Sequence, residues 1–210
     1  MRGASLTSNI IEFPKPRDQR LEEAVKLCNA RRFPAALSRL IQLIDEGCDE
    51  AYYYAGCIYE AGGNGVEKDL AKAIFYYEKS TQEYGSVEGC LALGRLYYFG
   101  IGVPKDHRKA FDLLTMIADE ANNGRGHGIA QMMLGQMYGE GLGVQQNIAT
   151  AREYFKKAAN QGYVFSFSAL STLEWRAGNY LKGLGLRIKA IWLALRITWS
   201  DPHDWRLRRS

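Results

Sequence analysis

Histidines, which often serve as general bases and metal ligands in proteins, are scarce in this 210-residue chain. The three that occur are His107, His127 and His203, and we expect each of them in a loop or in the tail. The sequence contains no H-E-x-x-H, G-x-S-x-G or phosphate-binding Gly-Lys-Ser/Thr run. It therefore predicts no catalytic residues, no metal site and no cofactor, with a hydrolase as the distant alternative.

The cysteines are a second group that could do chemistry, and there are four of them: Cys28, Cys48, Cys57 and Cys90. C-x-x-C spacing and paired histidines are typical of zinc sites. These cysteines show no such spacing and have no paired histidines nearby. Free cysteine packs as a small apolar residue. Free, mostly buried thiols are therefore favoured over a metal site or a disulfide.

Glycine-rich segments could bind phosphate groups, and Gly-x-Gly-Val occurs at residues 63–66, 100–103 and 141–144. A dinucleotide-binding loop follows a strand, whereas these segments follow apolar residues at helical spacing. We interpret them as turns. Residues 124–128 form a Gly-Arg-Gly-His-Gly insertion, for which a flexible surface loop is favoured over an anion or metal contact.

The glycine turns recur at a regular spacing, which is typical of repeat proteins. Val66, Val103 and Val144 end three such turns and lie 37 and 41 residues apart. Each valine is followed by Asp or Asn three positions later and by alanine seven positions later. A period in this range predicts stacked helix pairs that share one continuous core.

Each repeated position has a mechanical role in a helix pair. Gly56, Gly94 and Gly135 fall inside the first helix, where glycine costs about 1 kcal/mol relative to alanine. We therefore expect the second helix to approach closely at these glycines. The polar residues can cap the second helix by accepting from its free N–H groups. The capping residues are Asp69, Asp106 and Asn147, and the alanines of the contact face are Ala73, Ala110 and Ala151.

The repeat pattern resembles the Sel1-like repeat family, whose members are related to the tetratricopeptide proteins. In the second unit the matching residues are Leu93, Gly94, Tyr97, Gly100, Gly102, Val103, Asp106, Ala110 and Gly124. The resemblance implies an all-α fold, a right-handed α/α solenoid of antiparallel helix pairs. It also implies a non-enzymatic scaffold or adaptor that binds a protein or peptide partner.

The flanking segments fit the same scheme in a looser form, as terminal repeats often do. We therefore expect about three clear Sel1-like repeats between atypical helix pairs, with a long helix at the C-terminal end. The expected divisions are a disordered segment at 1–17, an atypical helix pair at 18–50, three repeats at 51–162, a helix pair at 163–199 and a basic tail at 200–210.

Composition limits the class of protein further. The formal net charge of +4 is too small to indicate nucleic-acid binding by itself, and we expect none. No apolar run reaches the roughly 18–20 residues of a membrane span, and residues 1–20 lack the apolar stretch of a secretion signal. These features favour a cytoplasmic protein.

The resemblance also indicates where a partner would bind, because in related solenoids the first helix of each pair lines the concave face. Counting from the anchored glycines predicts a face that mixes carboxylates with aromatic and methionine side chains, which suits an extended peptide or a partner helix. The predicted partner-binding residues are Tyr53, Glu60, Glu88, Leu91, Arg95, Tyr98, Met132, Gln136, Glu140 and Trp175.

The end of the chain is the most individual feature of the sequence. Residues 175–210 hold eight Lys or Arg and two Asp or Glu, and no acidic residue lies between Glu174 and Asp201. A helix at about 180–199 has a broad apolar face and a basic stripe. Arg206, Arg208 and Arg209 of the tail could add to an attraction for anionic lipid. The residues singled out for it are Lys182, Arg187, Lys189, Trp192, Arg196 and Trp199.

Three roles for this helix stay open. It could cap the open end of the solenoid, form a surface for a partner or for self-association, or lie on an anionic membrane with its tryptophans at the headgroup boundary. In the last case the protein would be a membrane-associated peripheral adaptor, for example in an envelope or polysaccharide-related assembly.

Overall fold

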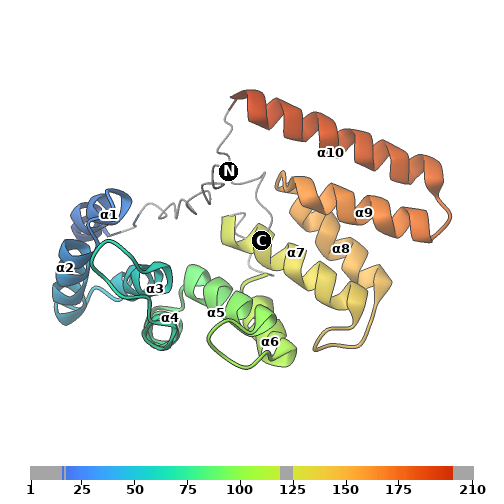
Figure 1. The fold of residues 1–210 in the computed structure, drawn as a ribbon. Helices are drawn as coiled ribbons and strands as arrows, with labels where there is room; N and C mark the ends of the chain where they lie inside the picture. The colour runs from blue at the N-terminus through green and yellow to red at the C-terminus, as the bar shows by residue number, and fades with distance from the viewer. Residues whose placement is uncertain (1–15, 17, 119–124, 201–210) are drawn as a thin grey trace, which may run out of the picture. The chain divides into compact units, whose positions relative to one another are not determined.

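A computed structural model of the chain describes residues 16, 18–118 and 125–200 (Figure 1). The predicted disordered segment and basic tail, including His203 and the arginines of the tail, lie almost entirely outside these residues, as does Gly124. The divisions drawn from the sequence stay predictions.

Within the described ranges the fold is all-α, as predicted, with ten α-helices, one short 3-10 helix and no β-strand. The elements are η1 (Gln19–Leu21), α1 (Glu22–Asn29), α2 (Phe33–Asp45), α3 (Ala51–Ala61), α4 (Leu70–Tyr84), α5 (Val87–Phe99), α6 (His107–Ala118), α7 (Arg125–Glu140), α8 (Ile148–Asn160), α9 (Val164–Arg176) and α10 (Tyr180–Ser200).

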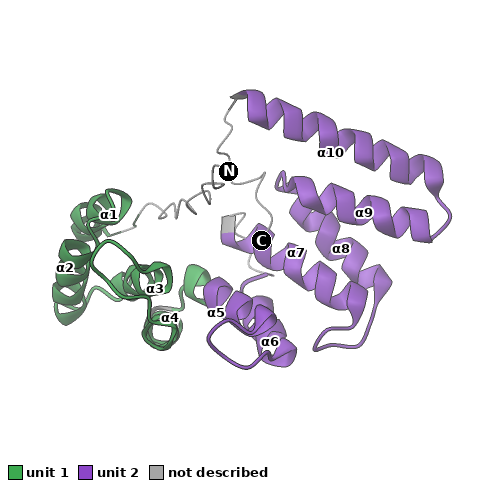
Figure 2. Cartoon of the chain, in the orientation of Figure 1, with its two compact units in different colours: residues 1–89 green, residues 90–210 purple. Residues whose placement is uncertain are grey.

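The helices form two compact units, Met1–Gly89 and Cys90–Ser210, whose boundary falls inside α5 (Figure 2). In unit 1 each helix packs against the next, from α1 through α4. The first pair turns at Arg31, whose φ of 54° is left-handed, and Pro34 follows in the first turn of α2. Leu40, Leu43 and Ile58 are completely buried and form part of the core of this unit.

In unit 2 the same sequential packing runs from α6 through α10. α5 and α6 meet at Gly94, where an added Cβ would lie 3.0 Å from the Leu114 side chain. The C-terminal part of the core includes Phe155, Leu170 and Leu173 and is completed by Ile197 of α10. Figure 1 shows α10 lying along α9.

The predicted helix caps are confirmed in all three repeats. The Asp69 and Asp106 carboxylates each accept from a backbone N–H three residues later at 2.9 Å, and the Asn147 side chain does the same at 3.1 Å. The backbone N–H of each cap donates to a tyrosine carbonyl in the preceding helix, at 2.8 to 2.9 Å. Each cap therefore begins one helix and joins it to the previous one. The accepting carbonyls belong to Tyr59, Tyr97 and Tyr138.

The close approach predicted at the helical glycines is also confirmed. A Cβ added at Gly56 would lie 2.7 Å from the Tyr77 ring, and one at Gly135 would lie 2.8 Å from the Phe155 ring. Both distances are shorter than van der Waals contact allows. The ring of the second helix thus occupies the space of the missing side chain. Ala73, Ala110 and Ala151 are fully buried at the same contacts.

The loop expected at residues 124–128 is wrong for the part that the structure describes, because α7 begins at Arg125. His127 is only 3% exposed, and His107 begins α6, so neither histidine lies in a loop. Tertiary packing explains the helix: an added Cβ at Gly128 would lie 2.3 Å from the Tyr163 ring. The glycine that looked like a sign of flexibility permits a tight contact.

The turn between α7 and α8 yields a prediction about stability. Gly143 has a φ of +68°, and a Cβ there would lie 2.4 Å from the His107 backbone. We expect Gly143→Ala to lower the free energy of unfolding by about 3 kcal/mol, because left-handed strain and a backbone clash add together. Urea unfolding followed by circular dichroism measures the effect.

Gly178→Ala is the matched control for this substitution. Gly178 has a φ of +79° but nothing within 4 Å of its added Cβ, so we expect a loss of only about 1 kcal/mol. Equal losses in the two variants would show that the contact between the α7–α8 turn and His107 contributes nothing.

Candidate functional site

The groups most able to do chemistry are kept apart or buried. The four cysteines are free and buried, as predicted. Burial raises the pKa of Cys28 to about 12 and that of Cys48 to about 11, so both thiols are protonated at neutral pH. In the part of the chain that the structure describes, no group of three or more His, Cys, Asp or Glu residues could hold a metal ion.

In unit 1 the predicted partner-binding residues lie around a hydroxyl cluster on α3 and α4. The Tyr77 hydroxyl donates to the Glu60 carboxylate at 2.8 Å and lies 3.5 Å from the Cys57 sulfur. The half-buried Tyr53 ring lies 5.9 Å from the Tyr77 ring. Loss of water around these phenols raises the pKa of Tyr53 and of Tyr77 well above the usual value. Both therefore stay neutral hydrogen-bonding groups.

Glu88 adds a second carboxylate to this surface. It is half-buried in the first turn of α5, where the Ser86 hydroxyl donates to it at 3.3 Å. Its charge also contributes to raising the pKa of Tyr53. The structure thus brings Tyr53, Glu60 and Glu88 into one acidic and aromatic surface of unit 1.

In unit 2 the predicted residues gather on α5 and α7. The exposed Gln136 side chain donates to Glu140 at 3.2 Å. The Tyr98 ring is buried, and its pKa is raised by burial and then by the Glu140 charge. These two exposed polar groups thus lie beside a buried aromatic ring. Leu91, Arg95 and Met132 are half-buried on the same two helices.

Trp175 lies with α10 instead. The indole is 42% exposed and meets the Tyr180 ring edge-on at 5.6 Å. A Cβ at Gly183 would lie 2.1 Å from its ring, so the missing side chain of α10 makes room for the indole. The Arg187 guanidinium lies 5.9 Å from the ring centre. Of the predicted concave residues, Trp175 therefore belongs to the α9–α10 contact.

The broad apolar face expected for the C-terminal helix is divided between two sides of α10. Gly183, Ala190 and Ile197 are buried in the packed core, with Leu186 and Leu193 partly buried beside them. A second set of large apolar side chains remains exposed, with 48 to 91% of each side chain open to solvent. This second set is Leu181, Leu184, Ile188, Ile191, Trp192, Leu195 and Trp199, and we call it the outer stripe.

The basic residues of α10 lie close to aromatic or acidic partners. Lys189 lies 5.0 Å from the Phe167 ring centre, and Arg196 lies 5.5 Å from that of Trp192. Such contacts are worth about 0.5–1 kcal/mol at exposed sites. Lys182 forms an ion pair with Glu174 at 3.1 Å, so part of its role is structural.

Glu174 is the residue that sequence reasoning missed. Its carboxylate is only 2% exposed, yet it meets partners from two other helices and a turn. Arg152 of α8 approaches to 3.2 Å, Lys182 of α10 to 3.1 Å, and the Asn179 amide donates at 2.9 Å. A lone acid before a 26-residue stretch without acidic residues was the available signal. Its burial could not be read from the sequence.

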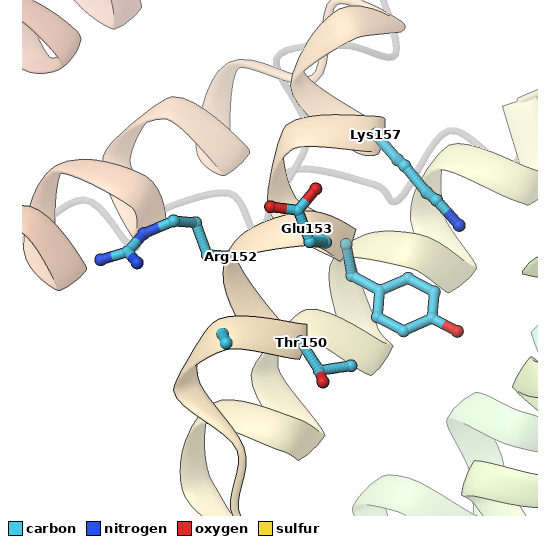
Figure 3. A pocket seen from close by; sticks show the side chains of 6 residues that line it. Thr150, Arg152, Glu153 and Lys157 are labelled. Carbon is cyan, nitrogen blue, oxygen red and sulfur yellow. The ribbon is translucent and has the colours of Figure 1, made fainter.

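A surface depression on α8 is shallow. It is lined by Ala149, Thr150, Arg152, Glu153, Tyr154 and Lys157. Figure 3 shows Arg152 and Lys157 directed to opposite sides of the helix. A single helix surface encloses no ligand, and ligand sites are usually concave. We assign it no function.

No helix within the described ranges is both long and apolar enough to cross a membrane.

Comparison with known proteins gives the context for these surfaces. The Sel1 repeat matches the chain at residues 49–83, 87–122 and 128–163, together just over half of its length. Human protein sel-1 homolog 2 is 36% identical over 98 residues, which cover 47% of this chain and 13% of that protein. A Sel1-like repeat-containing protein of Schizosaccharomyces pombe is 29% identical over 102 residues, covering 47% of this chain and 15% of its own. The chain thus spans only a small part of either relative.

Solved structures share the fold. A Sel1 repeat protein from Oxalobacter formigenes has a TM-score of 0.69 and 24% identity, over 83% of this chain and 69% of its own. A protective antigen of uropathogenic Escherichia coli has a TM-score of 0.66 and 23% identity, over 85% of this chain and 42% of its own. An immunity protein from Pseudomonas aeruginosa has a TM-score of 0.55 and 20% identity, over 91% of this chain and 72% of its own. These likenesses confirm the predicted solenoid.

Glu174 yields a prediction about pH. The Asn179 amide and then Lys182 hold the pKa of Glu174 below its usual value of 4.5. The charged form therefore contributes stability at neutral pH, and this contribution is lost as the pH falls through the lowered pKa. We expect Glu174→Gln to cost about 2 kcal/mol at pH 7, because ion pairs and a charged hydrogen bond are lost.

Thermal unfolding at a series of pH values from 7 to 3 measures this contribution. The difference in Tm between the wild type and Glu174→Gln should shrink below pH 4.5. Glu153→Gln, which removes an exposed carboxylate from neighbouring α8, should differ little from the wild type at neutral pH. A Tm difference for Glu174→Gln that stayed constant down to pH 3 would contradict the assigned role.

Proposed function

The chain belongs to the Sel1 repeat family, and from this membership we propose that it is a non-enzymatic scaffold. Its helix pairs would bind a protein or peptide partner through their concave faces. We place this adaptor in the cytoplasm, as the sequence composition suggests. The partner-binding residues remain those predicted from the sequence, apart from Trp175, which packs against α10.

The observation that carries the proposal is that, in each repeat, the residues that hold the helices together are different from those that vary between the repeats. The capping residues, turn glycines and contact alanines serve the pairing of the helices. What differs between repeats is the set of polar and aromatic side chains on the first helices. The exposed ones among them, such as Gln136 and Glu140, take no part in the caps or the helix contacts at the glycines, and specificity can therefore lie in them.

The two surfaces differ in chemistry. The unit 1 surface offers two half-buried carboxylates beside neutral tyrosines, which suits a basic or hydroxyl-bearing peptide. The unit 2 surface offers an exposed amide and carboxylate next to half-buried Leu91 and Met132. Aromatic and methionine side chains are enriched at interfaces. An extended segment with alternating polar and apolar side chains fits these features best.

The proposal that the protein is not an enzyme rests on the same residues. A nucleophile needs a base within hydrogen-bonding reach, and the thiols of Cys28 and Cys48 are buried with raised pKa values. His127 is buried in α7, and His107 lies 5.3 Å ring to ring from Tyr98. These groups fit packing better than catalysis.

The unit 2 surface supplies the test. We expect Gln136→Ala/Glu140→Lys to reduce recovery of cross-linked partners at least about tenfold, because one exposed hydrogen-bonding group is lost and one charge is reversed. The wild type and the variant are each used as bait, and the partners that each recovers are quantified by mass spectrometry. Both residues are exposed, so the helical content should be unchanged.

Gln145→Ala/Glu153→Lys is the matched control, since it makes the same chemical changes at exposed positions outside this surface. Its partner recovery should equal that of the wild type. If both double variants retained every wild-type partner, the unit 2 surface would not be the binding site. Glu60→Gln/Glu88→Gln applies the same test to unit 1.

The alternative considered from the sequence, a peripheral membrane adaptor, does not use these surfaces. It depends on α10.

A further inference from the structure

We propose that the outer stripe of α10 is a binding site for an anionic lipid surface, on which the helix lies flat. This inference goes beyond the scaffold function, because it concerns a different helix and a different class of partner. It rests on the exposure of the stripe, on the charges that border it and on the packing of the opposite side of the helix.

The stripe forms one continuous side of the helix. At 100° per residue, its members fall within a sector of about 100°. Gly183, Ala190 and Ile197 lie on the opposite side, in the core of unit 2. The exposed fraction reaches 89% for Leu181 and 91% for Trp199. The apolar side chains therefore remain open although the helix is already held in place.

The charges along α10 have one sign. Lys182, Lys189 and Arg196 are seven residues apart and border one edge of the stripe, while Arg187 lies beyond the other edge. α10 contains no acidic residue. The nearest carboxylate described, Glu174 of α9, is buried and already paired with Arg152 and Lys182. An anionic surface complements this edge of the molecule.

The dimensions suit an interfacial position. Leu181 and Trp199 are 18 positions apart, which is about 27 Å along a helix. Since α9 covers the opposite side, α10 can enter a lipid layer only by the depth of its exposed half. Interfacial helices are buried about 5–10 Å into the headgroup boundary. Tryptophan prefers this boundary, and Lys and Arg stems reach from it toward phosphate groups.

The same observations weigh against other occupants. A second copy would bring two basic edges together, because every charge on α10 is positive. A partner helix usually lies in an apolar groove, but the stripe belongs to a single helix. A lipid surface needs no groove.

Vesicle flotation with the full chain tests the proposal. The probes are phosphatidylcholine vesicles with and without one third phosphatidylglycerol. We expect at least about tenfold stronger binding to the anionic vesicles at 0.1 M salt. Binding should weaken at 0.5 M salt, because the Debye length shortens. Failure of the wild type to float with anionic vesicles would overturn the proposal.

Two sets of variants locate the binding. Leu181→Gln/Ile188→Gln/Trp199→Gln should weaken binding at least about tenfold, because exposed apolar area is removed. Phe75→Gln/Met116→Gln is the control, since these side chains are 53% and 66% exposed on other helices. Equal binding by the triple variant and the wild type would exclude the outer stripe.

The second set concerns charge. Lys189→Gln/Arg196→Gln should weaken binding about tenfold. Lys26→Gln/Lys105→Gln removes the same charge from exposed positions away from α10 and should have little effect. Equal effects of the two variants would show that overall charge, and not α10, attracts the protein. Far-UV circular dichroism confirms that each variant keeps its helices.

Sedimentation of the same proteins without vesicles distinguishes a second copy. A wild type that is monomeric at micromolar concentration and floats with anionic vesicles supports the proposal. A wild type that dimerises, loses the dimer in the triple variant and ignores vesicles would assign the outer stripe to self-association and overturn it.

Discussion

The close approach of two helices at a missing side chain is the constraint on which each repeat depends. At Gly56 and Gly135 an aromatic ring of the second helix sits where a Cβ would be. This contact fixes how near the helices lie. The cap that follows then joins the second helix to a carbonyl of the first. Both interactions join residues of one helix pair that are about 9 to 21 positions apart, so the contacts of a repeat lie within that repeat.

This locality explains how much of the fold the sequence predicts. The caps at Asp69, Asp106 and Asn147 act within three residues, and the turn glycines act within one. Such features repeat and are visible in one sequence. The loop expected at residues 124–128 is wrong for residues 125–128, where Gly128 lies against the ring of Tyr163, 35 residues further along the chain. A glycine that accommodates a distant ring looks the same in sequence as a glycine that permits a loop.

The surfaces are less predictable than the fold for a related reason. Counting along a helix grouped Tyr98, Gln136 and Glu140, which do lie close together because their positions follow from the repeat, while their role in binding stays a prediction. It did not distinguish Trp175 from the other predicted residues, although the indole packs against Gly183 of the next helix. Nor could periodicity decide which part of the apolar face of α10 is packed. Burial of Glu174 depends on Arg152 and Lys182, which approach it from two other helices.

The turn of the first repeat has a consequence for protein engineering. That turn is one residue longer than the other two, and the Gly63–Val66 bridge takes up the extra residue. The Asp69 N–H nevertheless donates to the Tyr59 carbonyl at the same 2.9 Å as its counterpart Asp106 donates to Tyr97. The junction between helices thus tolerates turns of different length. A foreign loop could therefore be grafted between the tyrosine and the capping residue of a repeat, such as Tyr59 and Asp69, while the two helices stay in place.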